Sequence, residues 1–342
     1  MGDKHRIRFE PVGVEIEADE EETVLDAAFR QGVNLMHGCK EGQCSSCKSF
    51  LIDGDQQMER YSTFALADYE SEEGYVLLCR AHAYGDLTVE LINYDEEMLL
   101  SGIPPRRVTG RVAAVEELTR DMSRLLVEPD TELPFRTGQY CDIRVPGTER
   151  WRSFSMAGLP TDTHLEFLVK RYPGGLFSGL LEPGAPGALR PGDAIDLKGP
   201  YGSCVLRDAP ERDLLLLAGG AGMAPVLAQL RTLAGQGSNR RTRFYYGART
   251  RADLFLLEEI AELGSRLPDF AFVAALSEES GTPYESGLIT DVLDRGEGEL
   301  GGTDAYLCGP PGMCDAALAT LTAKGLPEER IFLDRFTTSA TA

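Results

Sequence analysis

The chain has 342 residues, 42% of them hydrophobic, which is enough for two or three domains with full-sized cores. Its formal net charge of −21 at pH 7 argues against a nucleic-acid-binding protein, because phosphate backbones require patches of Lys and Arg. The acidic excess is concentrated in the first 97 residues, which suits either a basic protein partner or a solvated surface that keeps the protein soluble.

No segment resembles a targeting or membrane-spanning sequence. The start, MGDKHRIRFE, lacks the apolar core of a signal peptide. The longest uncharged run, residues 214–230, is shorter than the ~20 apolar residues of a membrane span, and its middle is rich in glycine. Eight cysteines without a secretory signal indicate a metal site in a reducing compartment. We therefore expect a cytoplasmic protein that does not enter a membrane, and we take the monomer as the default assembly.

Residues 1–98 are predicted to form a small α+β domain. IRFEPVGVEIEA, residues 7–18, alternates apolar and polar side chains as strands do. EETVLDAAFRQG, residues 21–32, has the apolar periodicity of a helix and ends at a glycine. A cysteine-rich loop follows, then one strand in SFLIDG, residues 49–54, and two strand-like runs within residues 75–92.

The rest of the chain divides into a linker and two further domains. Residues 99–107 contain adjacent prolines and a glycine, which indicate a linker. Short β-type runs separated by turns in residues 108–208 predict an antiparallel β-barrel. In residues 209–342, apolar strands alternate with helical segments, as in a Rossmann-like parallel sheet covered by helices. The fold class is therefore multidomain α+β and α/β.

The cysteine loop predicts a metal centre. CKEGQCSSCKS places Cys39, Cys44 and Cys47 at the spacing C-x4-C-x2-C, and Cys79 follows a later strand as the natural fourth ligand. This is the plant-type spacing for a 2Fe–2S cluster. Small residues around the loop would let backbone N–H groups approach the sulfur atoms and tune the reduction potential. These residues are Gly38, Gly42, Ser45 and Ser46.

Two other metal sites share parts of this pattern. A structural zinc site usually has two C-x2-C knuckles, and the chain has one. A Rieske centre needs two histidine ligands, and no Cys-x-His pair exists although His37 and His82 lie near the cysteines in sequence. We therefore favour the 2Fe–2S cluster and interpret both histidines as ordinary loop residues.

Three strings in residues 108–208 together indicate a flavin site. The first is WRSFSMAG, interpreted as a turn in which Arg152 would meet a pyrophosphate, Phe154 would pack on the ring system and Ser155 would hydrogen-bond near flavin N5. The second is KRYPGGLFSGLL, where the N–H groups of a short helical run after two glycines could receive a phosphate. The third is the turn GPYG, residues 199–202. Each string alone also fits a simple turn.

Five residues of the second string, all around its glycine turn, are predicted to belong to the flavin site. They are Lys170, Tyr172, Gly174, Gly175 and Ser178.

LLLLAGGAGMAP, residues 214–225, is predicted to be a strand, a glycine-rich turn and a helix. Gly219, Gly220 and Gly222 would let the pyrophosphate of a dinucleotide approach the backbone and the helix N-terminus. Met223 and Pro225, at the start of the helix, complete this part of the site. The turn departs from the strict G-x-G-x-x-G fingerprint, so it is only suggestive alone.

Two later strand ends extend the nucleotide site. YYGART places Gly247 and Arg249 where an adenosine ribose would lie. LCGPPGM places Cys308, Gly309 and Pro310 at the carboxyl edge of the sheet. There Cys308 could lie beside a nicotinamide or, alternatively, could simply be a small residue buried in the core. The remaining cysteines are interpreted as packing thiols: Cys141, Cys204 and Cys314.

The three sites together predict an order of electron transfer. A nicotinamide gives up two electrons as hydride, whereas a 2Fe–2S cluster accepts one, and a flavin can convert between the two. We therefore expect NAD(P)H to reduce the flavin, which would reduce the cluster, which would reduce a partner protein. Ser155 and Cys308 are the candidate catalytic residues.

These motifs, in this order, resemble the reductase components of bacterial multicomponent oxygenases, which join a plant-type ferredoxin domain of β-grasp fold to a ferredoxin–NADP reductase-like module. DAAFRQGVNLMHGCKEGQCSSCKS and RFYYGART look most like reductases of soluble di-iron monooxygenases of the methane and propane type. The resemblance covers nearly the whole chain. It implies FAD as the flavin, NADH as the donor and a di-iron hydroxylase as the acceptor, and it places Phe336 near the flavin.

The sequence departs from the family's usual motif at one position and also fits two other functions. The family's flavin motif often reads R-x-Y-S, and this chain has Phe154, which keeps stacking but lacks a hydroxyl. Arg249 and Arg251 could hold the 2′-phosphate of NADPH. A reductase of an aromatic ring-hydroxylating dioxygenase, with a Rieske-type acceptor, has the same parts. A zinc-binding module fused to a nucleotide sensor would be colourless and would not oxidise NADH.

Overall fold

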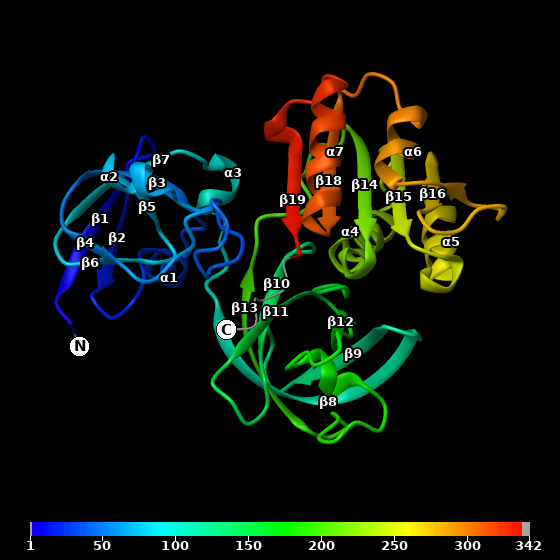
Figure 1. Cartoon of the computed structure of the whole chain (residues 1–342), viewed down its shortest axis with the longest axis horizontal. Coiled ribbons are helices and arrows are strands. Elements are labelled where there is room, and N and C mark those ends of the chain that lie inside the picture. Colours follow the sequence, from blue (N-terminus) through cyan, green and yellow to red (C-terminus); the bar gives the residue numbers. More distant parts are fainter. Residues whose placement is uncertain (1, 101, 337–342) are drawn as a thin grey trace. The chain divides into compact units, whose positions relative to one another are not determined.

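The computed structural model describes residues 2–100 and 102–336. The chain forms two compact units, Met1–Pro105 and Arg106–Ala342 (Figure 1). The first unit holds the cysteine loop, and the second holds the predicted flavin and nucleotide sites.

The first unit is built on a five-stranded sheet in the order β2-β1-β7-β3-β5. β1 and β7 run parallel and the other pairs antiparallel, which is the arrangement of a β-grasp fold. The strands are β1 (Lys4–Glu10), β2 (Val14–Asp19), β3 (Lys48–Asp53), β5 (Tyr75–Leu77) and β7 (Leu87–Leu91).

Helix α1 (Val24–Arg30) supplies the apolar face that the sequence predicts, and Val24 and Ala28 are fully buried. The Thr23 hydroxyl begins the helix by accepting a hydrogen bond from the Asp26 N–H at 3.1 Å. The segment around Cys79 contains three strands where two were predicted, because Ala81–Ala83 pairs with β4 outside the main sheet. The smaller elements are β4 (Gln56–Met58), α2 (Asp68–Glu72), β6 (Ala81–Ala83) and α3 (Glu96–Leu99).

The second unit begins with an antiparallel six-stranded sheet in the order β11-β10-β13-β8-β9-β12. It closes into a barrel where Met156, just after β11, bridges Phe167 of β12, and the Ala157 N–H donates to the Glu166 carbonyl oxygen at 2.8 Å. The prediction of a turn at WRSFS was wrong, because these residues form β11 and pair with β10. The strands are β8 (Arg106–Thr119), β9 (Met122–Pro129), β10 (Tyr140–Arg144), β11 (Trp151–Ser155), β12 (Leu165–Lys170) and β13 (Ala194–Tyr201).

The chain then forms a parallel six-stranded sheet in the order β17-β16-β15-β14-β18-β19 (Figure 1). Successive strands run outward from β14 in one direction until β18 begins on its other side, so the strand order reverses between β14 and β18. Ligands of open α/β sheets bind at this switch point. The strands are β14 (Asp213–Gly219), β15 (Thr242–Ala248), β16 (Phe270–Leu276), β17 (Glu285–Ser286), β18 (Thr303–Gly309) and β19 (Ile331–Arg335).

Helices cover both faces of this sheet. Leu214 and Leu216 of β14 belong to the core formed with α4 and α5, whereas Leu215 and Leu217 belong to the core formed with α6 and α7. Because successive side chains of a strand point to opposite faces, an unbroken run of leucines is what a strand buried on both sides requires. The helices are α4 (Met223–Gln236), α5 (Leu257–Ser265), α6 (Ile289–Gly296) and α7 (Pro311–Ala323).

Candidate functional site

The cysteine loop is wrapped so that backbone N–H groups point at its sulfur atoms. The N–H of Cys39 donates to the Cys44 sulfur at 3.3 Å, and the N–H of Gln43 donates to the Cys39 sulfur at 3.2 Å. Gly42 has a φ of +67°, and a Cβ on Gly38 would lie 3.0 Å from the Cys44 sulfur. The close approach that the glycines permit therefore supplies donors to thiolate ligands.

The four cysteines lie as two hydrogen-bonded pairs, Cys39 with Cys44 and Cys47 with Cys79. The hydrogen bond from Cys39 lowers the pKa of the Cys44 thiol to about 5, and the bond from Cys79 lowers the pKa of Cys47. The same bonds raise the pKa values of the two donors. One sulfur of each pair is thus stabilised as the thiolate, which is the form that binds metal.

This arrangement fits a cluster of two irons better than a single ion. Each iron of a 2Fe–2S cluster takes two cysteine sulfurs, and the three cysteines of the loop form two pairs together with Cys79. No group of three or more His, Cys, Asp or Glu side chains in residues 2–100 and 102–336 is placed to hold one metal ion. His37 hydrogen-bonds the Leu35 carbonyl oxygen at 2.8 Å, and His82, which lies in β6, contacts the Glu20 carbonyl oxygen at 2.9 Å.

Strand β11 carries the first predicted flavin string. Arg152 donates to the Trp151 carbonyl oxygen at 2.8 Å, and the Phe154 ring centroid lies 5.0 Å from that of Phe177. Ser155 is buried and donates from its hydroxyl to Asp334 at 3.1 Å. Since side chains alternate along a strand, Arg152 and Phe154 share one face and Ser155 lies on the other.

The second flavin string forms a compact turn after β12. Gly174 has a φ of +71°, and a Cβ on Gly175 would overlap the Ser178 hydroxyl, so both positions require glycine. The Ser178 hydroxyl accepts a hydrogen bond from the Tyr172 N–H at 3.2 Å, and Ser178 is the first residue of a short 3-10 helix, Ser178–Leu181. The hydroxyl proton of Ser178 remains available for an acceptor such as a phosphate oxygen.

The glycines at the end of β14 and just after it are required for two different reasons. Gly220 has a φ of +55° and no neighbour within 4 Å of an added Cβ, so its requirement is conformational and its open side faces free space. A Cβ on Gly222 would overlap the Cys308 carbonyl oxygen, and one on Gly219 would lie 2.7 Å from the Met313 sulfur. Gly222 therefore lets the turn after β14 pack directly against the end of β18, and Gly219 lets the end of β14 pack against the first turn of α7.

The ends of β18 and β19 bring Cys308 beside a carboxyl group that sequence reasoning missed. Cys308 and Asp334 are partners in register on neighbouring strands, and Asp334 accepts the hydrogen bond of Ser155. The Cys308 sulfur is fully buried and lies 3.8 Å from the Cys204 sulfur. Asp334 follows no recognisable motif, so only the pairing of β19 with β18 could have revealed it.

Burial raises the pKa of Asp334 to about 6, and the Ser155 hydroxyl opposes this shift. A carboxyl whose pKa is higher in the folded state stabilises the fold fully below its unfolded pKa of about 3.9, and that contribution is lost as pH rises through 6. Asp334→Asn, which mimics the protonated form, is expected to exceed the natural protein in stability at pH 7.5 by about 1–2 kcal/mol, allowing for partial exposure. Thermal unfolding at pH 7.5 and pH 5 would measure this; an advantage that does not shrink at pH 5 would contradict it.

A cavity of about 480 Å³ joins the barrel to the edge of the parallel sheet. It gathers predicted residues from four separate strings: Lys170 and Tyr172 at and beyond the end of β12, Gly219 and Gly220 at and beyond the end of β14, Pro310 after β18, and Phe336. The Phe336 N–H donates to the Gly309 carbonyl oxygen at 2.8 Å, which ties the chain after β19 to this edge. The cavity thus lies at the sheet's switch point, where a nicotinamide could meet a flavin.

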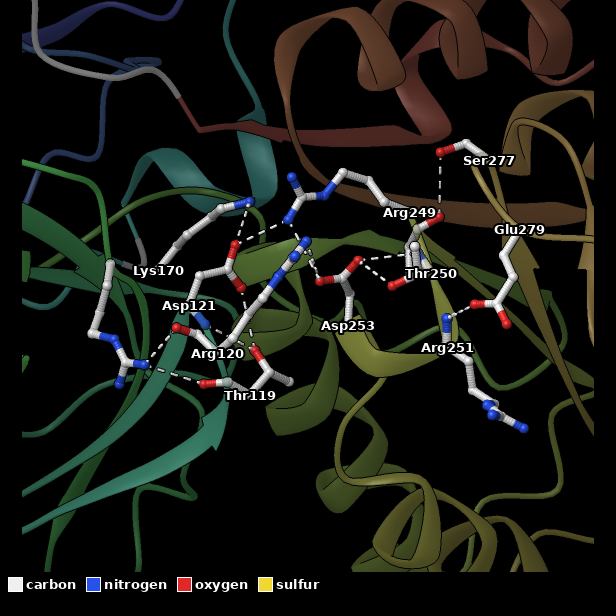
Figure 2. Close-up of polar contacts among 12 residues, drawn as sticks. Thr119, Arg120, Asp121, Lys170, Arg249, Thr250, Arg251, Asp253, Ser277 and Glu279 are labelled. Carbon is white, nitrogen blue, oxygen red and sulfur yellow. Dashed lines mark hydrogen bonds and ion pairs between the residues drawn. The ribbon is translucent and has the colours of Figure 1, made fainter.

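Arg249 lies beyond the end of β15 within a group of ion pairs (Figure 2). Its guanidinium contacts Asp121 at 3.1 Å and Asp253 at 3.5 Å, and Asp121 also contacts Lys170 at 3.5 Å. Gly247, within β15, lies next to Ile289 of α6, where a Cβ would come within 2.9 Å. Met223 and Pro225 are buried in the first turn of α4.

Comparisons with known proteins match each part of the chain to a family. Residues 7–84 match the 2Fe-2S iron-sulfur cluster binding domain, residues 109–205 the oxidoreductase FAD-binding domain, and residues 216–318 the oxidoreductase NAD-binding domain. Within the described part of the chain, no helix combines the length and apolar character needed to span a bilayer.

The chain is also similar to whole proteins over nearly its full length. The reductase component of a propane 2-monooxygenase from Rhodococcus jostii is 52% identical, over 99% of this chain and 93% of that protein. The electron transfer component of a toluate 1,2-dioxygenase from Pseudomonas putida is 33% identical, over 95% of each. The crystal structure of a cytochrome P450 reductase from Amycolatopsis is 29% identical with a TM-score of 0.88, covering 98% of this chain and 99% of that one.

The cofactors are thus a 2Fe–2S cluster, FAD and NADH. The spacing of the four cysteines, the order of the three domains and the identity over nearly the full length agree with one another. The chain belongs to the family of reductase components of bacterial soluble di-iron monooxygenases, in which a plant-type ferredoxin domain is joined to a ferredoxin–NADP reductase-like module.

Proposed function

We propose that this protein takes electrons from NADH and delivers them one at a time to the di-iron hydroxylase of an alkane-oxidising monooxygenase, of the propane type. The choice of acceptor is supported by sequence identity. The chain is 51–52% identical to propane 2-monooxygenase reductases but 33% identical to the electron transfer component of the dioxygenase. When bound, FAD supplies the conversion of a two-electron hydride into single electrons, and the cluster supplies their exit.

The residues of the chain would position these groups. Cys39, Cys44, Cys47 and Cys79 would hold the cluster, and the turn at Gly174 and Gly175 would receive a flavin phosphate. Ser155 would lie near the flavin's reactive nitrogen, and its hydroxyl would have to turn its proton away from Asp334, which accepts it in the structure, in order to donate there. The turn from Gly219 to Gly222 would receive the nucleotide's pyrophosphate, with Cys308 at the nicotinamide. The remaining contacts would come from Arg152, Phe154, Lys170, Tyr172, Ser178, Met223, Pro225, Gly247, Arg249, Gly309, Pro310 and Phe336.

Domain limits, assembly and compartment complete the proposal. We assign residues 1–98 to the ferredoxin domain, 99–107 to the linker, 108–208 to the flavin domain and 209–342 to the nucleotide domain. Eight free cysteines suit a reducing compartment, which supports a cytoplasmic location. We take the protein to act as a monomer that meets its hydroxylase transiently.

The decisive test combines spectroscopy with turnover. Purified protein should show flavin and iron–sulfur absorption that bleaches in stages on anaerobic addition of NADH. It should then support product formation by a propane-type di-iron hydroxylase, and not by a Rieske dioxygenase. Turnover with the Rieske enzyme alone would favour the alternative, a reductase of an aromatic ring-hydroxylating dioxygenase.

An acidic surface next to the cysteine loop suits the docking of this hydroxylase. The Ser62 N–H donates to the Gly42 carbonyl oxygen at 2.9 Å, so the segment that carries Phe64 is tied to the loop. Phe64 is 98% exposed. The acidic side chains near it in the chain or on the loop are Glu41, Glu59, Asp68, Glu72 and Glu73, which outnumber the basic Lys40 and Arg60 in the same segments, and Glu59 is paired with Arg80. An exposed aromatic among carboxylates fits a basic face with an apolar recess.

Phe64→Ala is expected to raise the KM for the hydroxylase by about tenfold or more, because a buried aromatic anchor dominates the binding energy of such interfaces. NADH oxidation with ferricyanide should be unchanged, since it needs no protein partner. Ile52→Ala provides the control, because Ile52 is half exposed on β3. Equal effects of the two substitutions would rule out Phe64 as an anchor.

A further inference from the structure

The end of β15 presents arginines where a nucleotide's adenosine ribose would lie. Gly219 of β14 and Gly247 of β15 are partners in register, so the residues after them share the carboxyl edge of the sheet. At such a strand end, a carboxylate commonly binds the ribose hydroxyls of NADH, whereas an arginine accommodates the 2′-phosphate of NADPH. Arg249 and Arg251 occupy this position, so the strand end alone would favour NADPH.

The structure shows that the Arg249 guanidinium is already engaged by a carboxylate from the barrel (Figure 2). Asp121 lies in the tight turn between β8 and β9 and contacts Arg249 at 3.1 Å across 128 positions of sequence. The Thr119 hydroxyl donates to the other oxygen of Asp121 at 3.2 Å, which fixes the carboxylate. Lys170, which lines the cavity, contacts the same carboxylate at 3.5 Å.

Other carboxylates complete the surroundings of Arg249 (Figure 2). Asp253 contacts Arg249 at 3.5 Å and Arg120 at 3.3 Å. Glu279 accepts a hydrogen bond from the Arg251 N–H at 2.7 Å, while the Arg251 guanidinium points away from Asp121 and Asp253. A 2′-phosphate arriving here would meet three carboxylates, and most of the basic side chains are already paired with them: Arg249 with Asp121 and Asp253, Arg120 with Asp253, and Lys170 with Asp121.

We propose that Asp121 sets the preference of this reductase for NADH over NADPH, because it holds the Arg249 guanidinium that would otherwise bind a 2′-phosphate. The inference rests on the proposed function, since it concerns the same nucleotide site. A 2′-phosphate must displace Asp121 from Arg249 and then remain near the displaced carboxylate, whereas a neutral 2′-hydroxyl can donate a hydrogen bond to it. The discrimination therefore acts by repelling the wrong nucleotide.

Asp121 is a better target for a test than Asp253, although both contact Arg249. Asp253 accepts hydrogen bonds from the Thr250 N–H at 3.0 Å and the Thr250 hydroxyl at 2.9 Å, which cap the short helix Arg251–Asp253. A substitution of Asp253 would disturb that turn. Asp121 belongs to the barrel, so its replacement leaves the capping of the nucleotide loop intact.

The experiment measures nucleotide preference in the whole protein. Asp121→Asn keeps the shape of the side chain, and it should lower the ratio of kcat/KM for NADH to that for NADPH by about tenfold, with ferricyanide as acceptor. Calorimetric titration with adenosine 2′,5′-bisphosphate should show tighter binding in the variant, and titration with AMP should change less. The gain should weaken at high salt, because it is electrostatic.

Two further variants test whether the change in nucleotide preference comes from the contact between Asp121 and Arg249. Asp121→Asn combined with Arg249→Gln should lose the gain for NADPH, because the guanidinium is then missing. Asp130→Asn should leave the ratio unchanged: this exposed aspartate also accepts a threonine hydroxyl, from Thr109 at 2.6 Å, but lies at the other end of β9. A single Asp121→Asn variant with an unchanged ratio, or with equal losses for both nucleotides, would overturn the proposal. NADH oxidation by the unaltered protein tests the proposed function separately.

Discussion

Replacing Cys44 by serine is expected to abolish reduction of cytochrome c while NADH oxidation with ferricyanide continues. Cys44 is one of the four cysteines of the C-x4-C-x2-C…C set, so its replacement removes one of the four thiolate ligands that a 2Fe–2S cluster needs. A serine hydroxyl does not ionise near neutral pH and cannot replace that ligand. Because the cluster is the exit for single electrons, we expect the rate with cytochrome c to fall by more than about 100-fold.

Iron content and visible absorption should be measured together with both activities. Ser45→Ala is the matched control, because Ser45 is exposed in the same loop and supplies no sulfur. It should keep its iron and both activities. If Cys44→Ser lost both activities and remained folded by circular dichroism, electrons would not pass from flavin to cluster in the order that we infer.

Replacing Gly222 by alanine is expected to destroy the nucleotide site. The added Cβ would overlap the Cys308 carbonyl oxygen, and backbone cannot move aside as a flexible side chain can. The end of β14 and the end of β18 would have to separate, at a cost of about 3 kcal/mol or more. We expect the NADH–ferricyanide activity to fall by more than about 100-fold, since 1.4 kcal/mol corresponds to a factor of ten.

Gly235→Ala tests whether that loss comes from the contact rather than from any change in α4. Gly235 lies in the same helix, and a Cβ there has no neighbour within 4 Å. This variant should gain up to about 1 kcal/mol of stability, because alanine favours helix over glycine. Thermal unfolding and NADH titration of both variants would decide the matter; near-normal NADH affinity in Gly222→Ala would show that the two strand ends can separate freely.

The sequence predicted the parts of the fold whose signals are local. The 2Fe–2S spacing, the helix at Val24–Arg30 and the alternation of strands with helices after residue 209 each depend on neighbouring residues, and the fold class follows from them. WRSFS was wrongly predicted as a turn because its polar residues hide a strand that pairs with β10. A barrel strand next to a ligand site does not need an apolar run.

The interactions that the sequence could not supply join distant segments. Asp334 meets Ser155 only because β19 pairs with β18 and the barrel lies against that edge. Asp121 meets Arg249 through contact between a barrel hairpin and the end of β15. Neither residue stands in a motif, and a side chain whose role depends on tertiary contact leaves no periodic or spaced pattern to detect. The two arginines after β15 therefore left NADPH open as the donor, and only the structure shows that Arg249 is paired with Asp121.

The run of leucines in β14 limits which sequence changes this strand can accept. Its four leucines face two different cores in alternation, and because they are identical, a shift by one position would bury the same atoms on both sides. The leucines cannot specify their own register, which must come from the strand's ends. Other β-forming apolar residues could replace them, but an insertion or deletion before Gly219 would displace the turn that meets Cys308. The length of this strand, more than its composition, is what homologous sequences must preserve.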